Sequence, residues 1–452
     1  MTKMVSGLLV LALGVGTASV RAQDLPTLTL EEALDIARDR NPSYLTAIAQ
    51  ADASGASVRQ QYGAFFPSLS LSMGWNGSSR TSLSAEDEFG QTVTLPDPVS
   101  VRGSSASQGF SASWTLFDGL RNVNSLGAAK FNLAAAHAGA DYQGINVDAE
   151  VSQRFYQAVR EQRLVEVEEQ LLTSAQERLS ANERLFRVAS VSQVDVLGAR
   201  VDLASAQQQL DVQLASARKA RLQVLQSLGI LGEIDDFTLE GGFPPVFDPE
   251  TLTIDDLVQR AFEANPVVAQ REFQYESARK SSAAARGAWL PSLSFNGGWS
   301  RGQQNQGFGA VFDFDPGQNR GYSFGISVNW QAFDGFQRSQ AIASANSQAR
   351  QAQETLRLES LQLEQAVRAA FIDLQTAHSG LDLQRRATEL SRQRIEFAQE
   401  QYREGAIDFT SLQQIIDNGA QQERSLVNAE FNFANQLVLL EQQVGEPVRP
   451  QG

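Results

Sequence analysis

The feature that most constrains this chain is its internal duplication. Segments of the first half return in the second, first 224 and then 216 residues later: Asn41-Pro42 as Asn265-Pro266, Pro67-Ser68-Leu69 as Pro291-Ser292-Leu293, and Phe117-Asp118-Gly119 as Phe333-Asp334-Gly335. The spacing therefore changes once, by eight residues, between Trp299 and Trp330. Because internal repeats indicate repeated structural units, we expect two copies of one architecture.

Each half is expected to hold a helix broken at Asn-Pro, two strands, a long helix and a shorter return helix. Proline disfavours helix at the residue before it, which places the break. The predicted divisions are a signal peptide (1–22), a first repeat (23–229; strands 67–77 and 108–117, long helix 119–188, return helix 191–228), a linker (230–251), a second repeat (252–445; strands 291–301 and 322–333, long helix 335–404, return helix 407–444) and a tail (446–452).

The first residues have the layout of a secretory signal peptide. Met-Thr-Lys precedes an apolar run from Met4 to Val20, and Val20-Arg21-Ala22 places a small residue before the predicted cleavage site after Ala22. A membrane-spanning helix is the weaker alternative, because the run is near the lower length limit. No later window has enough consecutive apolar residues for a spanning helix.

Composition excludes several classes of protein. The chain has no cysteine, so disulfides, thiol catalysis and lipid attachment through cysteine are excluded. Its formal charge of −15 argues against nucleic acid as a partner. The only histidines, His137 and His378, are not repeat-equivalent, and no phosphate loop, nucleophile elbow or metal-spaced cluster occurs. We therefore expect neither an enzyme nor a cofactor or metal site.

Four runs alternate with period two, which predicts strands. In the first, Leu69, Leu71, Met73 and Trp75 share a face, and Ser and Gly occupy the other. The uncharged polar face and the length of about ten residues suit tilted membrane strands better than a soluble sheet. The tryptophans near the strand ends are expected at the two membrane interfaces, as aromatic girdles: Trp75, Trp114, Trp299 and Trp330.

Four strands cannot close a barrel, and an open edge in lipid leaves backbone groups unpaired at a cost of several kcal/mol each. The chain is therefore expected to assemble with further copies. The polar stretches 76–107 and 300–320 are expected to be loops outside the cell.

The long helices are expected to leave the membrane. No proline lies between Gly119 and Val188 or between Gly335 and Glu404, and 70 residues of helix would extend about 105 Å. Their Ala, Leu, Gln, Arg and Glu content, with apolar residues three and four apart, is typical of amphipathic helices packed in water.

In this order, the duplicated motifs resemble the TolC family of outer-membrane efflux ducts over residues 28–445. The resemblance implies a mainly helical protein with a membrane β-barrel: duplicated αββαα halves, four strands per chain, and a homotrimer with a 12-stranded barrel in the outer membrane that continues into a 12-helix periplasmic barrel. It also implies a passive exit duct for efflux or type I secretion, with a periplasmic adaptor and an inner-membrane pump of RND, ABC or MFS type as partners.

Residue roles follow from the same resemblance. Gate candidates at the periplasmic helix turns are Asp195, Tyr402, Asp408, Ser411 and Gln414, and the expected adaptor contacts are Val188, Ala189, Ser190, Glu404, Gly405 and Ala406. The family's latch arginine corresponds to Ile407, and its acidic ring positions correspond to Ser411 and Gln414, so this latch departs from the family pattern. Asp195 and Asp408 are equally expected as helix caps.

The duplicated Phe-Asp-Gly is interpreted as the junction where a strand becomes a periplasmic helix. Phe117 and Phe333 are expected to pack into this joint, Asp118 and Asp334 to cap the helix, and Gly119 and Gly335 to let the chain turn. The alternatives to a duct are a trimeric structural or adhesive stalk and a simple passive channel. The substrate is not encoded in any motif.

Overall fold

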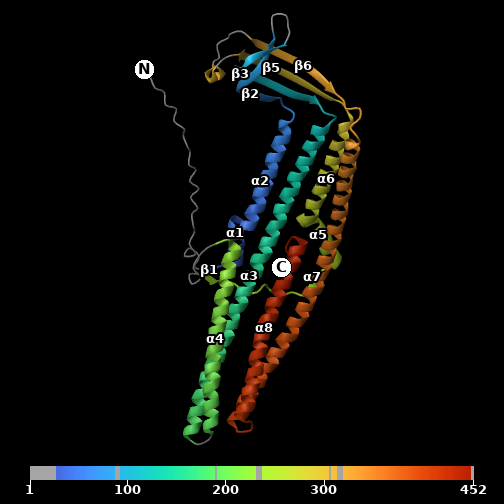
Figure 1. Cartoon of the computed structure of the whole chain (residues 1–452). Coiled ribbons are helices and arrows are strands. Elements are labelled where there is room, and N and C mark those ends of the chain that lie inside the picture. The colour runs from blue at the N-terminus through green and yellow to red at the C-terminus, as the bar shows by residue number, and fades with distance from the viewer. Residues whose placement is uncertain are drawn as a thin grey trace. The chain divides into compact units, whose positions relative to one another are not determined.

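A computed structural model describes residues 27–86, 92–188, 191–230, 237–304, 307–312 and 319–448 (Figure 1). The chain divides into two compact units. Unit 1 comprises Met1–Ile48, Gly139–Pro266 and Ser360–Gly452, and unit 2 comprises Ala49–Ala138 and Val267–Glu359. Residues 1–22, where the sequence predicts a signal peptide, lie outside the described residues.

Unit 2 contains an antiparallel sheet in the order β2-β3-β5-β6. Its strands are β2 (Ser68–Glu86), β3 (Thr92–Phe117), β5 (Ser292–Gln304) and β6 (Arg320–Asn329). Leu69 lies opposite Ala112 in the first hairpin, and their repeat equivalents, Leu293 and Val328, lie opposite each other in the second. The two hairpins therefore share one register, as the duplication requires.

The strands differ in extent from the sequence-based expectation. The β2–β3 ladder continues through the stretch 76–107 expected as a loop and ends at the pair Glu86 and Thr92. A register shift leaves 95–98 without partners between the pairs Ser82–Val99 and Ser84–Thr94. This segment contains Pro96 and Pro98, which cannot donate to a ladder. In the second repeat, β6 ends at Asn329 rather than at 333.

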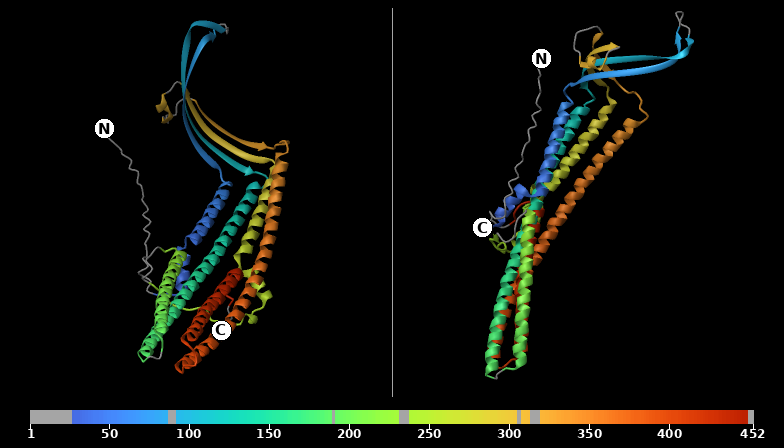
Figure 2. Two further views of the ribbon diagram at one scale, coloured as in Figure 1. Left: turned by 60° about the horizontal axis from the view of Figure 1, so that its bottom comes forward. Right: turned by 60° about the vertical axis from the view of Figure 1, so that its left-hand side comes forward.

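Six longer helices precede the strands, follow them, or return beside another helix (Figure 2). Where the sequence predicted 119–188, 191–228, 335–404 and 407–444, the structure has α3 (Arg121–Arg187), α4 (Gln193–Leu228), α7 (Gln337–Arg403) and α8 (Phe409–Val444). The segments that lead into the sheet are α2 (Pro42–Gly63) and α6 (Pro266–Arg286), and the latter continues into the 3-10 turn η4 (Gly287–Trp289). A further 3-10 turn, η5 (Phe308–Phe312), lies between β5 and β6 in the sequence.

The two Asn-Pro breaks perform the same task in unit 1. Asn41 ends α1 (Leu30–Arg40), donates its amide to the carbonyl of Ser227 at 2.7 Å, and accepts from the Ser43 amide. Asn265 ends α5 (Ile254–Ala264) and donates to the carbonyl of Gln443 at 2.8 Å. Each buried asparagine thus ties a short helix to the last turn of the return helix of its own repeat.

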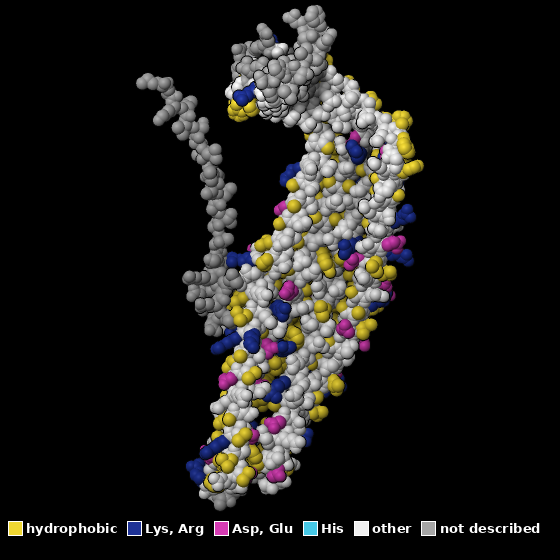
Figure 3. All heavy atoms as spheres, viewed as in Figure 1, with side chains coloured by type: hydrophobic (Ala, Val, Ile, Leu, Met, Phe, Trp, Pro, Cys, Tyr) yellow, Lys and Arg dark blue, Asp and Glu magenta, His cyan; other side chains and the backbone are white. Residues whose placement is uncertain are grey.

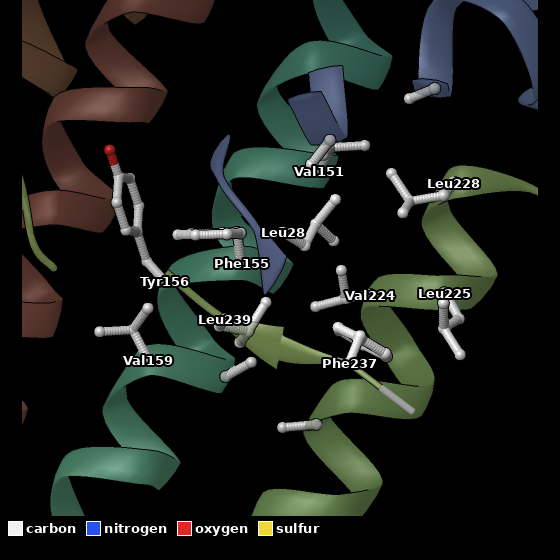
Figure 4. Packing of buried hydrophobic residues seen from close by; sticks show 14 of the residues in the cluster. Leu28, Val151, Phe155, Tyr156, Val159, Val224, Leu225, Leu228, Phe237 and Leu239 are labelled. Carbon is white, nitrogen blue, oxygen red and sulfur yellow. The ribbon is translucent and has the colours of Figure 1, made fainter. Parts of the chain in front are cut away.

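The predicted linker contains an element that the sequence did not reveal. β1 (Thr27–Leu28) pairs in parallel with β4 (Thr238–Leu239), and a short turn, η3 (Pro249–Thr251), precedes α5. Leu28 and Leu239 enter the main core of unit 1, where side chains of α3 and α4 surround them (Figure 4). Strands of two residues are too short to show a period-two pattern, so the sequence does not indicate them and the structure does, through their pairing.

No helix within the described ranges is apolar and long enough to cross a membrane. On the face in Figure 3, cationic and anionic side chains are interspersed along the helices rather than gathered. Such a mixture of charges is expected on helix faces that contact water.

Truncation of the fully buried Leu28 should destabilise unit 1. Leu28→Ala removes apolar contacts with Phe155, Val224 and their neighbours, and large-to-small core changes of this kind cost about 2–5 kcal/mol. Thermal unfolding followed by circular dichroism should give a lower Tm than for Glu31→Ala, an exposed change on the adjoining helix. Equal Tm values for the two variants would contradict this assignment of the core.

Candidate functional site

The strand-to-helix junctions in unit 2 repeat their hydrogen bonds. A carboxylate oxygen of Asp118 accepts from the backbone amide of Asn122 at 2.8 Å, and Asp334 accepts from that of Arg338 at 2.9 Å. Gly119 and Gly335 both have positive φ, of 75° and 64°. Each aspartate therefore satisfies a first-turn amide of the outgoing helix, and each glycine supplies a conformation that other residues rarely adopt.

A second duplicated set ties each junction to the helix that enters the sheet. The indole of Trp114 donates to the carbonyl of Phe65 at 2.9 Å, and that of Trp330 donates to the carbonyl of Trp289 at 3.2 Å. Phe65 and Trp289 are themselves repeat equivalents. Each tryptophan therefore holds the segment that enters the sheet against the segment that leaves it. This contact is separate from the position at the membrane interface that the sequence predicted.

The expected packing of the junction phenylalanines into the joint stays a prediction, because one chain alone leaves Phe333 72% exposed. Its ring meets that of Phe336 edge-on at 5.6 Å. Phe117, the last residue of β3, is 39% exposed and lies opposite Leu293. Phe333 is more exposed because β6 ends at Asn329. Phe333 therefore lies outside the ladder and has no described strand beside it to pack against.

The other two tryptophans expected at the membrane interfaces, Trp75 and Trp299, lie in β2 and β5. Trp75 is exposed and contacts the ring of Phe308 from η5. Trp299 is half-buried and lies opposite Phe110 on β3 and Tyr322 on β6. An aromatic row therefore crosses three strands at one level.

At the helix turns of unit 1, both aspartates that the sequence named as gate candidates cap helices. Ser192 and Asp195 form a capping box at the start of α4: the Asp195 amide donates to the Ser192 hydroxyl at 3.2 Å, and the carboxylate accepts from the Ser192 amide at 2.9 Å. At the start of α8, Asp408 accepts from the amide of Ser411 at 2.7 Å. The hydroxyl and amide of Ser411 lower the pKa of Asp408.

Tyr402 bridges the two helical hairpins. Its hydroxyl donates to the side-chain oxygen of the buried Asn182 on α3 at 3.0 Å, and burial raises the pKa of Tyr402, with Asp195 contributing through its charge. The resemblance named Tyr402 and Asp195 together as gate candidates, and within the chain the hydroxyl of Tyr402 donates to Asn182. A pocket of about 630 Å³ beside this contact is lined by both hairpins, among them Arg178, Leu185 and Phe409.

The remaining tip residues have different environments. Ile407, at the position of the family's arginine, packs against a small apolar cluster with Leu412 and Ile416. Ser411 and Gln414 are exposed. Of the expected adaptor contacts, Val188, Glu404, Gly405 and Ala406 are exposed, and Ala189 and Ser190 lie outside the described residues.

Farther from the turns, a charged cluster joins α3, α4 and α8. Arg424 forms two hydrogen bonds with Glu168, at 2.6 and 2.9 Å, and the Glu168 side chain is only 4% exposed. These bonds raise the pKa of Arg424. A buried bidentate pair of this kind is strongly destabilising to break from one side, so it fixes one hairpin against the other.

Beside this pair, a cavity of about 330 Å³ contains charges that are less well satisfied. Two guanidinium nitrogens of Arg178 and one carboxylate oxygen of Asp202 are buried without a hydrogen-bond partner. Burial raises the pKa of Asp202 against the opposing effect of Arg178, and the charge of Asp417 raises it further.

Sequence analysis had singled out neither Asn182 nor this cluster. A single polar residue among helical Ala, Leu and Glu carries no distinctive spacing, so Asn182 gave no motif. One signal was available in the sequence. Glu168 and Arg178 are charged residues of α3 that lie near the apolar positions of its buried face. Within the described ranges, no three His, Asp or Glu side chains are placed to hold a metal ion.

Comparison with known proteins matches both repeats to one family. The family model for outer membrane efflux proteins matches residues 33–230 and 257–446. Protein CyaE of Bordetella pertussis is 25% identical over 364 residues, covering 79% of this chain and 71% of CyaE.

Solved structures share the fold at low sequence identity. A membrane protein from Pseudomonas aeruginosa is similar with a TM-score of 0.74 and 19% identity, covering 92% of this chain and 93% of that one. The CmeC outer membrane channel of Campylobacter jejuni is similar with a TM-score of 0.74 and 17% identity, covering 93% and 87%.

The partly buried carboxylate of Asp202 should make stability depend on pH. Because its pKa is raised in the folded state, the native chain binds this proton more tightly than the unfolded chain does. Its contribution therefore falls as pH rises above the ordinary value of 3.8. Asp202→Asn should give a flatter Tm-versus-pH profile in that range than the exposed Asp211→Asn on the same helix. Identical profiles would refute the buried-charge assignment.

Proposed function

The chain belongs to the outer membrane efflux protein family, and from this premise we propose that it is the exit duct of a tripartite efflux or type I secretion system. It is an outer-membrane protein that extends into the periplasm and works with a periplasmic adaptor and an inner-membrane pump. The observation that carries the proposal is that both matched repeats join a pair of strands to a 67-residue helix. A simple channel has no need for such helices.

The proposed assembly is a homotrimer in which twelve strands form a barrel and twelve helices form a periplasmic tube. The support from the sheet is that β2 and β6 each pair on one side only among the described strands. Unpaired strand edges in hydrocarbon cost several kcal/mol per backbone group, so further copies must supply the partners. Three chains of four strands would give a barrel wide enough for a lumen, whereas side chains fill one of about eight strands.

The helices of unit 1 support the same assembly independently. Tyr156 on α3 is 3% exposed and Val438 on α8 is 5% exposed, whereas their repeat equivalents, Ile372 on α7 and Leu222 on α4, are 56% and 43% exposed. Further exposed apolar residues recur along α7 at seven-residue spacing: Leu383, Leu390 and Phe397. A second copy that packs α4 against α7, as α8 packs with α3 here, would cover them.

The proposed gate is the contact of Tyr402 with Asn182, at the hairpin turns that would form the periplasmic end of the tube. Opening requires that one hairpin move away from the other, and this hydrogen bond joins them. Asp195, Asp408, Ser411 and Gln414 are proposed as polar groups that line the gate, with the two aspartates also serving as caps. Val188, Ala189, Ser190, Glu404, Gly405 and Ala406 are proposed as adaptor contacts, since the described members are exposed at the turns.

The proposed role is passive. A pump of RND, ABC or MFS type would supply the energy and choose the substrate, and the duct would provide the path. No catalytic residue or cofactor is proposed for this chain.

Planar-bilayer conductance tests the duct and its gate together. The chain should conduct weakly, and Tyr402→Phe should raise conductance several-fold. The phenylalanine cannot donate to Asn182, and a hydrogen bond of this kind contributes about 1 kcal/mol. Asn182→Ala should act in the same direction.

Tyr62→Phe is the matched control, because this tyrosine lies on α2 in the other unit. Absence of any conductance would favour the stalk over the duct. Conductance that is unchanged in both gate variants would reject Tyr402–Asn182 as the gate while leaving the duct intact.

A further inference from the structure

The two hairpins of the sheet differ at the ends that lie away from the helices. β2 and β3 stay paired as far as Glu86 and Thr92, whereas β5 ends at Gln304 and the 3-10 turn η5 (Phe308–Phe312) follows it. This is also the region in which the second repeat is eight residues shorter than the first. Among the described residues of the first repeat, η5 has no counterpart, so the shared architecture does not require it.

η5 packs against the apolar face of the sheet. Trp75 lies opposite Ala106, and Gln108 lies two residues farther along β3 on the same face. The side-chain amide of Gln108 donates to the carbonyl of Val311 at 2.7 Å, and the ring of Phe308 meets that of Trp75 edge-on at 6.4 Å. Ala106 and Gln108 are both buried. η5 is therefore held on this face by a hydrogen bond and by an aromatic contact.

The hydrogen bond satisfies a polar group on an otherwise apolar face. Gln108 lies opposite Arg301 of β5, and both side chains are buried. Polar and charged side chains that face hydrocarbon are costly unless they are covered or paired. The contact of η5 with Gln108 therefore makes this level of the face compatible with a lipid environment.

The outer side of η5 is aromatic. Val311 points into the contact and is 4% exposed, whereas Phe308 and Phe312 are 63% and 61% exposed. The two phenylalanine rings meet edge-on at 5.8 Å, so with Trp75 they form one exposed aromatic cluster. This cluster continues the apolar face of the strands instead of interrupting it.

The level of η5 on the sheet follows from the length of β3. Ala106 lies eight residues before Trp114, which adjoins the junction with α3. With a rise of about 3.3 Å per residue and a strand tilt of about 40°, Ala106 lies about 20 Å from Trp114 along the barrel axis. The apolar band of outer-membrane barrels is about 25 Å tall. η5 therefore lies near the outer boundary of such a band, where aromatic side chains favour the membrane interface.

We propose that η5 is a membrane anchor in the outer leaflet: it lies on the lipid-facing side of the barrel, and Phe308 and Phe312 insert between the lipid head groups and the acyl chains. The inference rests on the proposed barrel, because closure of the barrel turns this face toward lipid. The occupant is lipid rather than a second copy because the rings extend the outward face, whereas copies join along the strand edges.

Spin-label accessibility tests this position, because the chain has no cysteine of its own. A label on Gly309→Cys projects from η5 into open space, since a Cβ there meets no atom within 4 Å. The labelled full chain is placed in vesicles of phosphatidylethanolamine and phosphatidylglycerol. Oxygen concentrates in lipid and a nickel chelate stays in water, so the ratio of oxygen to chelate accessibility should be high at this label.

Three further single labels provide the scale. Phe324→Cys lies on the same apolar face, and Ser323→Cys lies on the polar face beside it. Thr81→Cys lies on the face of Trp75, six residues farther along β2, and should be in water beyond the membrane. The label at Gly309 should give a ratio close to that at Phe324 and several-fold above the other two. A ratio equal to that at Thr81 would overturn the anchor, as would shielding of Gly309 from both reagents, which would indicate a second copy.

Removal of the two rings tests whether they hold η5 in the lipid. Phe308→Ser with Phe312→Ser, added to Gly309→Cys, should lower the ratio at the label several-fold, toward that at Thr81. The matched control is Phe333→Ser with Phe336→Ser, which removes another exposed edge-on pair of phenylalanines beyond the opposite end of β6 and should leave the ratio unchanged. An unchanged ratio in the η5 double variant would reject the two rings as the anchor.

The outcomes separate this inference from the proposed function. Equal ratios at Ser323 and Phe324 would mean that the sheet does not divide lumen from lipid, and would overturn both the barrel and the anchor. Different ratios at these two positions, with Gly309 matching Thr81, would overturn the anchor and leave the barrel in place.

Discussion

Backbone N–H and C=O groups within hydrocarbon have no water to bond, so every strand edge there needs a partner. Among the described strands, the sheet β2-β3-β5-β6 satisfies this condition at its three internal ladders and leaves both outer edges without a partner. The proposed assembly of several copies would satisfy the condition at these edges. The duplication supplies a solution, because an edge of one repeat already pairs with the complementary edge of the other inside the chain.

The same duplication organises the change from strand to helix. At each junction an aspartate caps the new helix, a glycine turns the chain, and a tryptophan indole holds the incoming segment. Asn122 donates to the carbonyl of Ala64, and its equivalent, Arg338, donates to that of Ala288. The side chain changed between the repeats while the carbonyl that it satisfies did not. At this position the two copies preserve the contact rather than the residue identity.

Polar contacts join the hairpins in unit 1 at more than one level. Tyr402 meets Asn182 near the turns, and Arg424 meets Glu168 farther along. The first is a single neutral hydrogen bond, worth about 1 kcal/mol, and the second is a buried charge pair that is much harder to break. This ranking suits a tip that separates at its end while the hairpins stay together above it.

From the sequence, the repeat, the four strands, the long helices and the capping aspartates of the junctions could be predicted, because each rests on local periodicity or on short motifs. The full length of β2 and β3, the β1–β4 pair and the exposure of Phe333 could not, since they depend on which segments become neighbours. Asn182 is the clearest case: it becomes the partner of Tyr402 only when helices 220 residues apart pack with a particular rotation. The sequence alone determined the elements and their order, and the tertiary structure decided which side chains meet, because contact between distant segments is set by packing and not by local pattern.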